Sequence, residues 1–162
     1  MTGMRLRRWM DDDVEAFYDI YSRWEVMRHL GAHPRRVVRD REEALARLGR
    51  MRGREDGPRG YWAIEVDGVP VGTVLLLPLH GDGDGGSEVE VGWHLHPGHH
   101  GKGLATRAAR ELLSRTSGRV LALTDQDNLA SQAVAVRLGM TDEGLTDRWY
   151  GITARQYAIM LG

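Results

Sequence analysis

The spacing of hydrophobic residues changes several times along the chain, and each spacing predicts one kind of element. Alternating or continuous apolar runs are typical of strands, whereas apolar residues every three or four positions are typical of amphipathic helices. We expect strands at 4–9, 61–66, 71–79, 87–97, 119–124 and 155–161, and helices at 11–27, 40–51, 104–116 and 128–140. An antiparallel meander followed by a β-α-β unit predicts an α/β (α+β) fold, with a mixed, mostly antiparallel sheet and helices on both faces.

The strand expected at 87–97 alternates strictly, so its two faces differ in chemistry. Its apolar face carries Val89, Val91, Trp93 and Leu95, and its polar face carries Glu88, Glu90, His94 and His96. The plain interpretation of the polar face is a solvated surface.

Capping and turn residues agree with these boundaries. Asp40 and Glu43 resemble a capping box at the start of the second helix, and Gly139 suits the end of the last one. The stretch "DGVP" at 67–70 indicates a hairpin, and "GDGDGG" at 81–86 indicates a second, longer one.

Composition narrows the class of protein. The chain has 162 residues, 41% of them hydrophobic, a net charge of −1 and no cysteine. This length suits a single domain, 1–162. The lack of cysteine excludes disulfides, thiolate metal sites and a cysteine nucleophile. The interspersed charges predict no nucleic-acid surface. The longest apolar run is too short for a membrane span, and the N-terminus lacks a signal-peptide core, so we expect a cytoplasmic protein.

Three glycines stand in the stretch "HPGHHGKGLATRA", residues 96–108, between a strand and a helix. The first amides of a helix have no internal partner, and the helix dipole makes that end positive. Gly101 and Gly103 would let the backbone approach a bulky anion, which predicts a phosphate or pyrophosphate site. A Walker A loop does not fit, because Gly98 stands two residues too close to the Gly-Lys pair. The dinucleotide fingerprint fails at Thr106, where it requires glycine.

The segment "HGKGLA" (100–105) resembles the Arg/Gln-x-x-Gly-x-Gly/Ala signature of the GCN5-related N-acetyltransferase (GNAT) superfamily. The resemblance covers nearly the whole chain. "WEVMRHL", "YWAIEVDGVPVGTVLLL", "EVGWHLHP" and "NLASQAVAVRLGM" are similar, in this order, to motifs of its RimJ/RimL-like subgroup, which acetylates protein N-termini. The family fold implies a sheet that splays between its fourth and fifth strands.

The resemblance implies acetyl-CoA as co-substrate and no metal. It assigns the pyrophosphate to a loop formed by His100, Gly101, Lys102, Gly103, Leu104, Ala105 and Thr106. It also assigns a backbone contact with the pantetheine arm to Leu95, and it matches Ser131 to a serine that lies near the thioester. Asn128 is a candidate either to bind the cofactor chain or to fix the acceptor. His100 departs from the usual arginine or glutamine, although imidazole can still donate a hydrogen bond across the loop.

The chemistry of amine acetylation requires a group that accepts the ammonium proton and help for the departing thiolate. Glu90 is the candidate base, directly or through water, and Glu88 is the reserve because a bulge in this strand would shift the register. Ser131 is the candidate donor to the sulfur. Many family members use a tyrosine in the last helix as acid, but Ala135 stands at the matching position here.

Plainer interpretations stay open beside these. Glu88 and Glu90 fit a solvated strand face, Asn128 fits a helix N-cap, and Ser131 fits an ordinary first turn. Four histidines, His94, His96, His99 and His100, admit a zinc site. The runner-up function, ahead of this histidine metal site, is a degenerate domain that binds acyl-CoA as a sensor or interaction module without turnover.

The amine acceptor is the least constrained partner. We expect its pocket to be built by "WEVMRHLGAHPRRVV" and "TDRWYGITARQ", with Trp24 and Trp149 as candidate lining residues. A peptide N-terminus, an amino acid and an amino-bearing small molecule all fit this mixture of arginines and aromatics. Monomer and homodimer are both left open.

Overall fold

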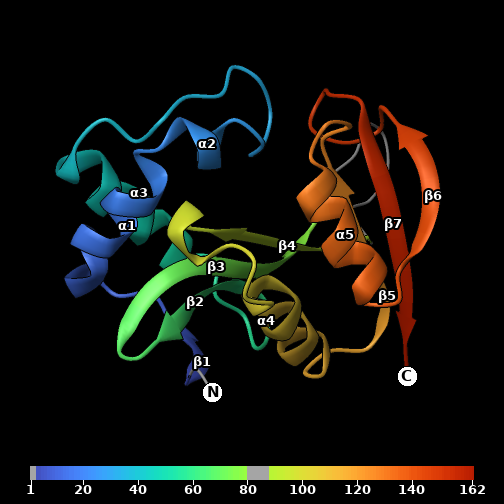
Figure 1. The fold of residues 1–162 in the computed structure, drawn as a ribbon, viewed down its shortest axis with the longest axis horizontal. Helices are drawn as coiled ribbons and strands as arrows, with labels where there is room; N and C mark the ends of the chain where they lie inside the picture. Colours follow the sequence, from blue (N-terminus) through green and yellow to red (C-terminus); the bar gives the residue numbers. More distant parts are fainter. Residues whose placement is uncertain (1–2, 80–87) are drawn as a thin grey trace.

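The computed structural model describes residues 3–79 and 88–162, so the hairpin predicted at 81–86 lies outside the described residues. In the described part of the chain, seven strands form one sheet in the order β1-β2-β3-β4-β5-β7-β6 (Figure 1). The strands are β1 (Met4–Arg8), β2 (Gly60–Val66), β3 (Val69–Pro78), β4 (Val89–Leu95), β5 (Gly118–Thr124), β6 (Thr141–Thr146) and β7 (Ala154–Leu161).

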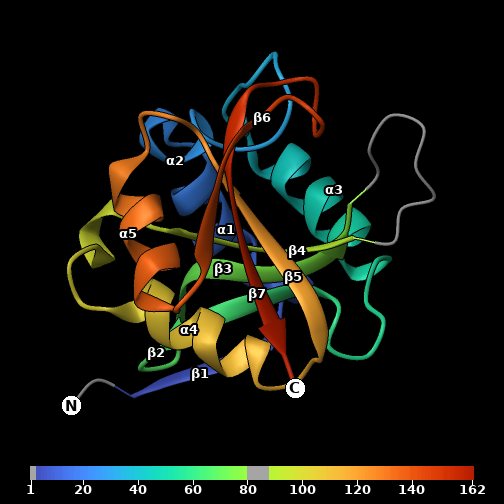
Figure 2. The ribbon, with the colours of Figure 1, turned by 90° about the vertical axis from the view of Figure 1, so that its right-hand side faces the viewer.

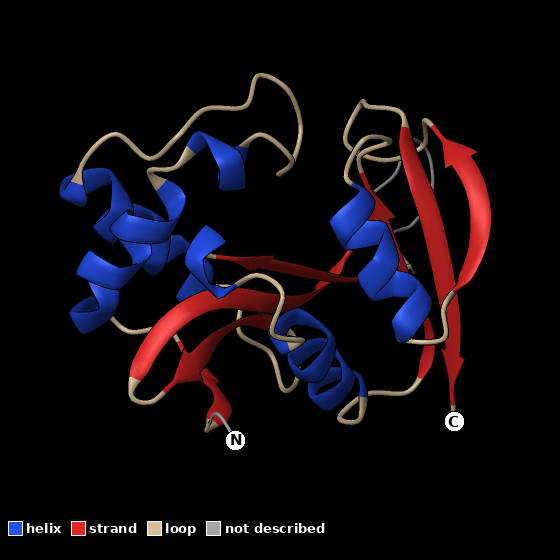
Figure 3. Ribbon diagram, viewed as in Figure 1, coloured by secondary structure: helices blue, strands red, loops and turns tan. Residues whose placement is uncertain are grey.

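Helices cover both faces of the sheet, as expected (Figures 2 and 3). They are α1 (Val14–Tyr21), α2 (Trp24–Met27), α3 (Arg41–Arg52), α4 (Leu104–Leu113) and α5 (Leu129–Arg137), with short 3-10 turns at Asp11–Asp13 and Pro97–His99. Helices α1 to α3 pack one apolar cluster onto one face of the sheet. Helices α4 and α5 contribute to a larger cluster on the other face. The mixed fold is therefore confirmed.

Two predictions of secondary structure are wrong. The single helix expected at 11–27 is broken at Arg23, which has extended backbone angles. The break turns α2 so that Val26 and Met27 reach the same cluster as α1. Strand β6 was not expected, because its sequence "TDEGLT" is mostly polar and exposed. It is an edge strand held by backbone pairing with β7, and such pairing requires no hydrophobic alternation.

The sheet opens between β4 and β5, as the family resemblance implies. These two strands pair in parallel, and Glu90 with Leu121 is the single registered pair between them in the described residues. Strand β4 pairs with β3 without a shift from Val89 to Leu95, so no bulge changes its register. Residues 91–95 therefore present a strand edge toward the gap.

Most of the capping residues and hydrophobic patterns noted in the sequence have the predicted structure. The Asp40 side chain accepts a hydrogen bond from the Glu43 amide at 2.8 Å, and Gly139 has a φ of +83° just beyond α5. On β4, Val91 and Leu95 are buried in the larger cluster, with Val89 and Trp93 packed against it. None of the helices in the described ranges combines the length and the apolar character that a membrane crossing requires.

Candidate active site

A cleft of about 660 Å³ lies where β4 and β5 diverge. Its lining comes from α3, the segment after α2, strand β4, the end of β5, the start of α5 and the loop between β6 and β7. Glu90, Asn128 and Ser131 all line this cleft. The structure thus brings together three of the predicted site residues from elements far apart in the sequence.

Glu90 is a buried carboxyl group, with 8% of its surface exposed. Its Oε1 accepts a hydrogen bond from the Tyr150 hydroxyl. Burial raises the pKa of Glu90 to about 7, against the opposing effect of the Tyr150 hydrogen bond. The solvated interpretation of this strand face is therefore wrong for Glu90, because its carboxyl group is buried against the Tyr150 hydroxyl. A carboxyl group with a pKa near neutrality is well matched to proton transfer at physiological pH.

Replacing Glu90 with glutamine should remove a pH-dependent cost of folding. The folded-state pKa lies above the ordinary 4.5, so this group's contribution to stability is full below about pH 4.5 and is lost as pH rises through about 7. Since one pKa unit corresponds to about 1.4 kcal/mol, the loss in the wild type totals roughly 3 kcal/mol. We expect the free energy of unfolding of Glu90→Gln to lack this loss, because glutamine does not ionise. Denaturant unfolding of both proteins at mildly acidic and mildly alkaline pH measures this, and parallel pH dependences would contradict it.

Tyr150 was not singled out by the sequence, although it lies in the C-terminal stretch expected near the acceptor. It has a φ of +60°, a left-handed backbone that residues other than glycine seldom adopt. This conformation places its hydroxyl on Glu90. At the position where many relatives have a tyrosine, Ala135 is fully buried in the core. The tyrosine hydroxyl that contacts the candidate base therefore comes from Tyr150, in the loop between β6 and β7, and not from α5.

His94 joins a chain of hydrogen bonds that ties β4 to α1. Its Nδ1 lies 2.6 Å from the Tyr21 hydroxyl, which also bonds the Thr73 hydroxyl, and Trp9 donates to Thr73 at 3.1 Å. Burial lowers the pKa of His94 to about 4, so its ring is neutral at pH 7. The chain fixes the same strand face that carries Glu90.

The four histidines do not gather into a metal site. His94 faces Tyr21, whereas His96 accepts a hydrogen bond from the Gly98 amide and places its Nε2 3.1 Å from Asp19. His100 is exposed in the loop. The rings of His96 and His99 lie edge to face, 6.0 Å apart, but within the described part of the chain none of the four histidines belongs to a group of three ligand-type side chains close enough to hold a metal ion. The zinc hypothesis is therefore wrong in its geometry.

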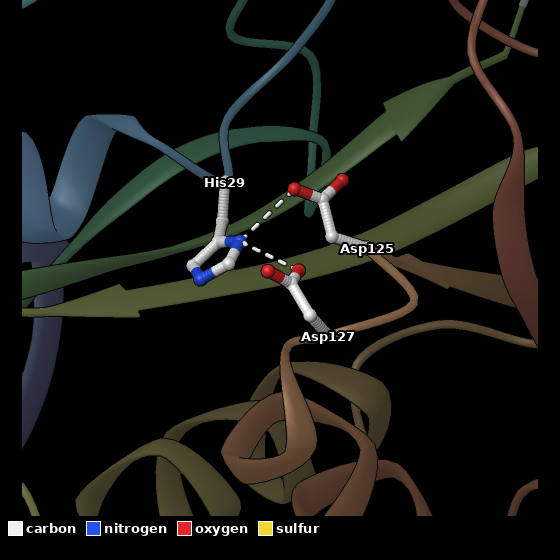
Figure 4. A group of neighbouring side chains, drawn as sticks. All are labelled: His29, Asp125 and Asp127. Atoms are coloured by element: carbon white, nitrogen blue, oxygen red, sulfur yellow. Dashed lines mark hydrogen bonds and ion pairs between the residues drawn. The ribbon is translucent and has the colours of Figure 1, made fainter.

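A different group of side chains of the kinds that bind metal ions lies at the rim of the cleft: His29, Asp125 and Asp127 (Figure 4). The Nδ1 of His29 lies 2.9 Å from Asp125 and 3.8 Å from Asp127. Arg35 binds both oxygens of Asp125, and Arg28 contacts Asp127 at 3.2 Å. Burial raises the pKa of Asp125, but the hydrogen bonds from Arg35 and His29 outweigh it and hold that pKa below its usual range. The arginines already neutralise both carboxylates, so this network ties the segment after α2 to the loop before α5.

The glycine-rich loop has the geometry expected of an anion site. Gly101 and Gly103 have φ values of +78° and +73°, and Gly103 is the N-cap of α4. The backbone amides of residues 101–106 donate no hydrogen bond within the described part of the chain; the first helical bond runs from Arg107 to Gly103. The side chains of Leu104, Ala105 and Thr106 are buried, so these residues offer backbone to a ligand. We call these six successive amides, which have no partner in the described residues, the amide cradle, because free amides at a helix start can donate to an anion.

Other predicted residues lie outside the cleft. The Glu88 side chain approaches Arg119, 3.7 Å away, and is not part of the lining. Trp149 is buried against Leu79, Leu121 and Ala158, so its assignment to the acceptor pocket is wrong. Trp24 is 54% exposed and does not line the cleft; it lines an adjoining hollow that shares His29 and Asp125 with it.

Two residues at the end of β5 and the start of α5 complete the lining. Thr124 is buried and lines the cleft, and its hydroxyl has no partner among the described residues. Sequence reasoning missed it, because a threonine that ends an apolar strand carries no distinctive signal. Asn128 accepts a hydrogen bond from the Ser131 amide at 3.3 Å, which confirms the N-cap interpretation.

Comparison with known proteins assigns the family. The model of the acetyltransferase (GNAT) domain matches residues 4–141, most of the chain. The chain belongs to the GNAT acetyltransferase family. A mycothiol acetyltransferase from Nocardia farcinica is 32% identical over 99 residues, which are 61% of this GNAT chain and 30% of that protein. The chain therefore spans less than a third of that relative's length.

Solved structures agree on the fold of this GNAT chain. A Salmonella typhimurium structure with its cofactor acetyl-CoA has a TM-score of 0.74 at 22% identity, covering 99% of this chain and 95% of that one. A ribosomal L7/L12 α-N-protein acetyltransferase in complex with coenzyme A has a TM-score of 0.76 at 18% identity, covering 99% and 96%. Acetyl-CoA is the co-substrate that this family membership indicates.

Proposed function

We propose that this GNAT chain transfers an acetyl group from acetyl-CoA directly to a primary amine in a ternary complex. The observation that carries the proposal is the row of free amides at 101–106, beside the gap between β4 and β5. Both features are polar backbone without a partner in the described residues. Strand β4 lines the cleft that holds Glu90, and the loop with the free amides follows the end of β4. The donor set fits a ligand with a pyrophosphate and an amide-bearing arm.

We assign the pyrophosphate to the amides of the loop that runs from His100 to Thr106. The free edge of β4 up to Leu95 is assigned to the pantetheine arm, because its backbone groups face the gap. Bound acetyl-CoA supplies an acetyl group already activated as a thioester. His100, exposed at the mouth of the loop, braces the loop in place of the usual arginine or glutamine.

The remaining roles fall to side chains of the cleft. Glu90 accepts the proton of the acceptor ammonium, and the Tyr150 hydroxyl holds the carboxylate in place. Ser131 donates a hydrogen bond to the departing sulfur, and Asn128 orients the cofactor chain from the same helix start. The unpaired hydroxyl of Thr124 offers one more hydrogen bond to a bound substrate.

We also propose the RimJ/RimL-like subgroup and a cytoplasmic setting. The motifs "WEVMRHL" and "NLASQAVAVRLGM" support the subgroup, and the similar fold of the L7/L12 enzyme is consistent with it.

Turnover tests the function. Purified protein is mixed with acetyl-CoA and a panel of primary amines, and released thiol is measured with and without each amine. We expect amine-dependent thiol release and an acetylated product with the mass of one added acetyl group. Tight coenzyme A binding without release for any amine would instead favour an acyl-CoA-binding module.

A further inference from the structure

One wall of the cleft carries an excess of positive charge. The arginines that line the cleft are Arg35, Arg36, Arg47, Arg50 and Arg54. Two of them are neutralised: Arg35 binds Asp125, and Arg36 contacts Glu43 at 2.7 Å. The other three belong to α3 and the residues just after it, and they carry no paired carboxylate among the described residues.

Arg47 is the most constrained of these three. It is partly buried, and burial lowers its pKa. The charge of Glu43 reaches Arg47, but Glu43 is already in contact with Arg36 and Arg39, and the Arg47 guanidinium itself makes no hydrogen bond or ion pair with any described residue. Arg50 lies three positions further along α3, on the same side of the helix, and is likewise without a partner in the described ranges. Arg54 has a 3.3 Å hydrogen bond to the Tyr61 hydroxyl. A guanidinium stays charged at any physiological pH, so an unpaired one in a cleft favours an anionic ligand.

These charges act on the residues around the candidate base. The charge of Arg54 reaches Glu90 and Tyr150, and that of Arg47 reaches Tyr21 and Tyr61. An amine that approaches Glu90 therefore enters a positive field. A polycationic amine is repelled there, whereas an amine that also carries an anion gains a partner for the arginines.

We propose that the acceptor is an amino acid with a free carboxylate, and that Arg47, with Arg50 and Arg54, binds this carboxylate while the amine faces Glu90. The inference rests on the proposed acetyl transfer and names its substrate class. The planar fork of a guanidinium matches the two oxygens of a carboxylate, which gives direction as well as attraction.

The phosphates of coenzyme A are a second anionic ligand, and the structure separates the two sites. Residues 101–106, which form the amide cradle, are absent from the lining of the cleft that holds the arginines. The arginine variants should therefore keep the wild-type affinity for coenzyme A, measured by calorimetry. Loss of that affinity in Arg47→Gln would overturn the assignment to the acceptor.

Matched pairs of acceptors test the proposal. Each of the twenty amino acids is compared with its carboxamide, which keeps the amine and loses the negative charge, and a polyamine is added. We expect the best amino acid to exceed its carboxamide at least about tenfold in kcat/KM. Arg47→Gln and Arg50→Gln should raise KM for the amino acid with little change in kcat, and bring the ratio toward one. Arg41→Gln is the control, because Arg41 starts the same helix but pairs with Glu15 outside the cleft.

A binding measurement separates this proposal from the proposed function. The same ligands are titrated into the complex with coenzyme A, and the thermal melting temperature is followed. A stabilisation by carboxylates that is lost in Arg47→Gln supports the proposal even without turnover. Equal use of amino acids and carboxamides, a preference for the polyamine, or neither turnover nor stabilisation with carboxylates overturns it. Acetylation of a non-carboxylate amine would leave the proposed function standing while this inference falls.

Discussion

Glu90→Gln should lower kcat/KM for amine acetylation by at least about tenfold at neutral pH. A positioned general base contributes typically about 10²–10⁴-fold, and glutamine keeps the shape and the hydrogen bond from Tyr150 while losing the ability to accept a proton. Acetyl-CoA affinity should change little, because the amide cradle is a separate part of the molecule. Steady-state kinetics and calorimetry on the same preparations measure both quantities.

The pH dependence identifies the group. Because burial raises the pKa of Glu90 to about 7, wild-type kcat/KM should rise with pH through that value. The deficit of Glu90→Gln should shrink at higher pH, where the acceptor amine loses its own proton. In Tyr150→Phe the inflection should move to higher pH. The hydrogen bond from Tyr150 stabilises the charged carboxylate in the wild type, so its removal raises the pKa of Glu90. Glu88→Gln is the comparison, because Glu88 lies outside the cleft. The assignment fails if Glu88→Gln shows the larger deficit.

Gly103→Val should abolish measurable coenzyme A binding while the protein still unfolds cooperatively. Gly103 has a φ of +73° at the N-cap of α4, a conformation that a β-branched residue adopts only under strain. Open space surrounds its missing side chain, so the fold tolerates the added atoms. Relief of the strain turns the amides of 101–106 out of alignment, and a side chain there blocks the approach of the anion.

Gly118→Val provides a matched control for this strain. Gly118 has a φ of +85°, is likewise surrounded by open space, and begins β5 away from the cradle. Both substitutions should lower the melting temperature by similar amounts, but Gly118→Val should bind coenzyme A as the wild type does. Unchanged affinity in Gly103→Val would exclude the cradle as the pyrophosphate site.

Local patterns predicted most of the fold. The strand expected at 71–79 is β3, buried on both faces, and the helix expected from 104 begins at Leu104. The left-handed glycines before α4 were also accessible, because glycine is the residue that adopts a positive φ at little cost. The helix break at Arg23 and the polar strand β6 were not accessible, since each depends on a partner element rather than on its own hydrophobic pattern.

The sequence by itself determined which residues alternate on β4, where the glycines stand and which family motifs follow one another. The tertiary structure decided the chemistry of the site. Glu90 lies on a face that alternation marked as polar, yet the fold buries its carboxyl group and brings Tyr150, sixty positions away, into contact with it. In the same way, the pattern of α3 shows arginines, but only its packing against α1 and β2 places Arg47 in the cleft lining. Burial and contacts between distant residues set the pKa of Glu90 and the positive field of the arginines around it. Neither effect is a local property of the chain.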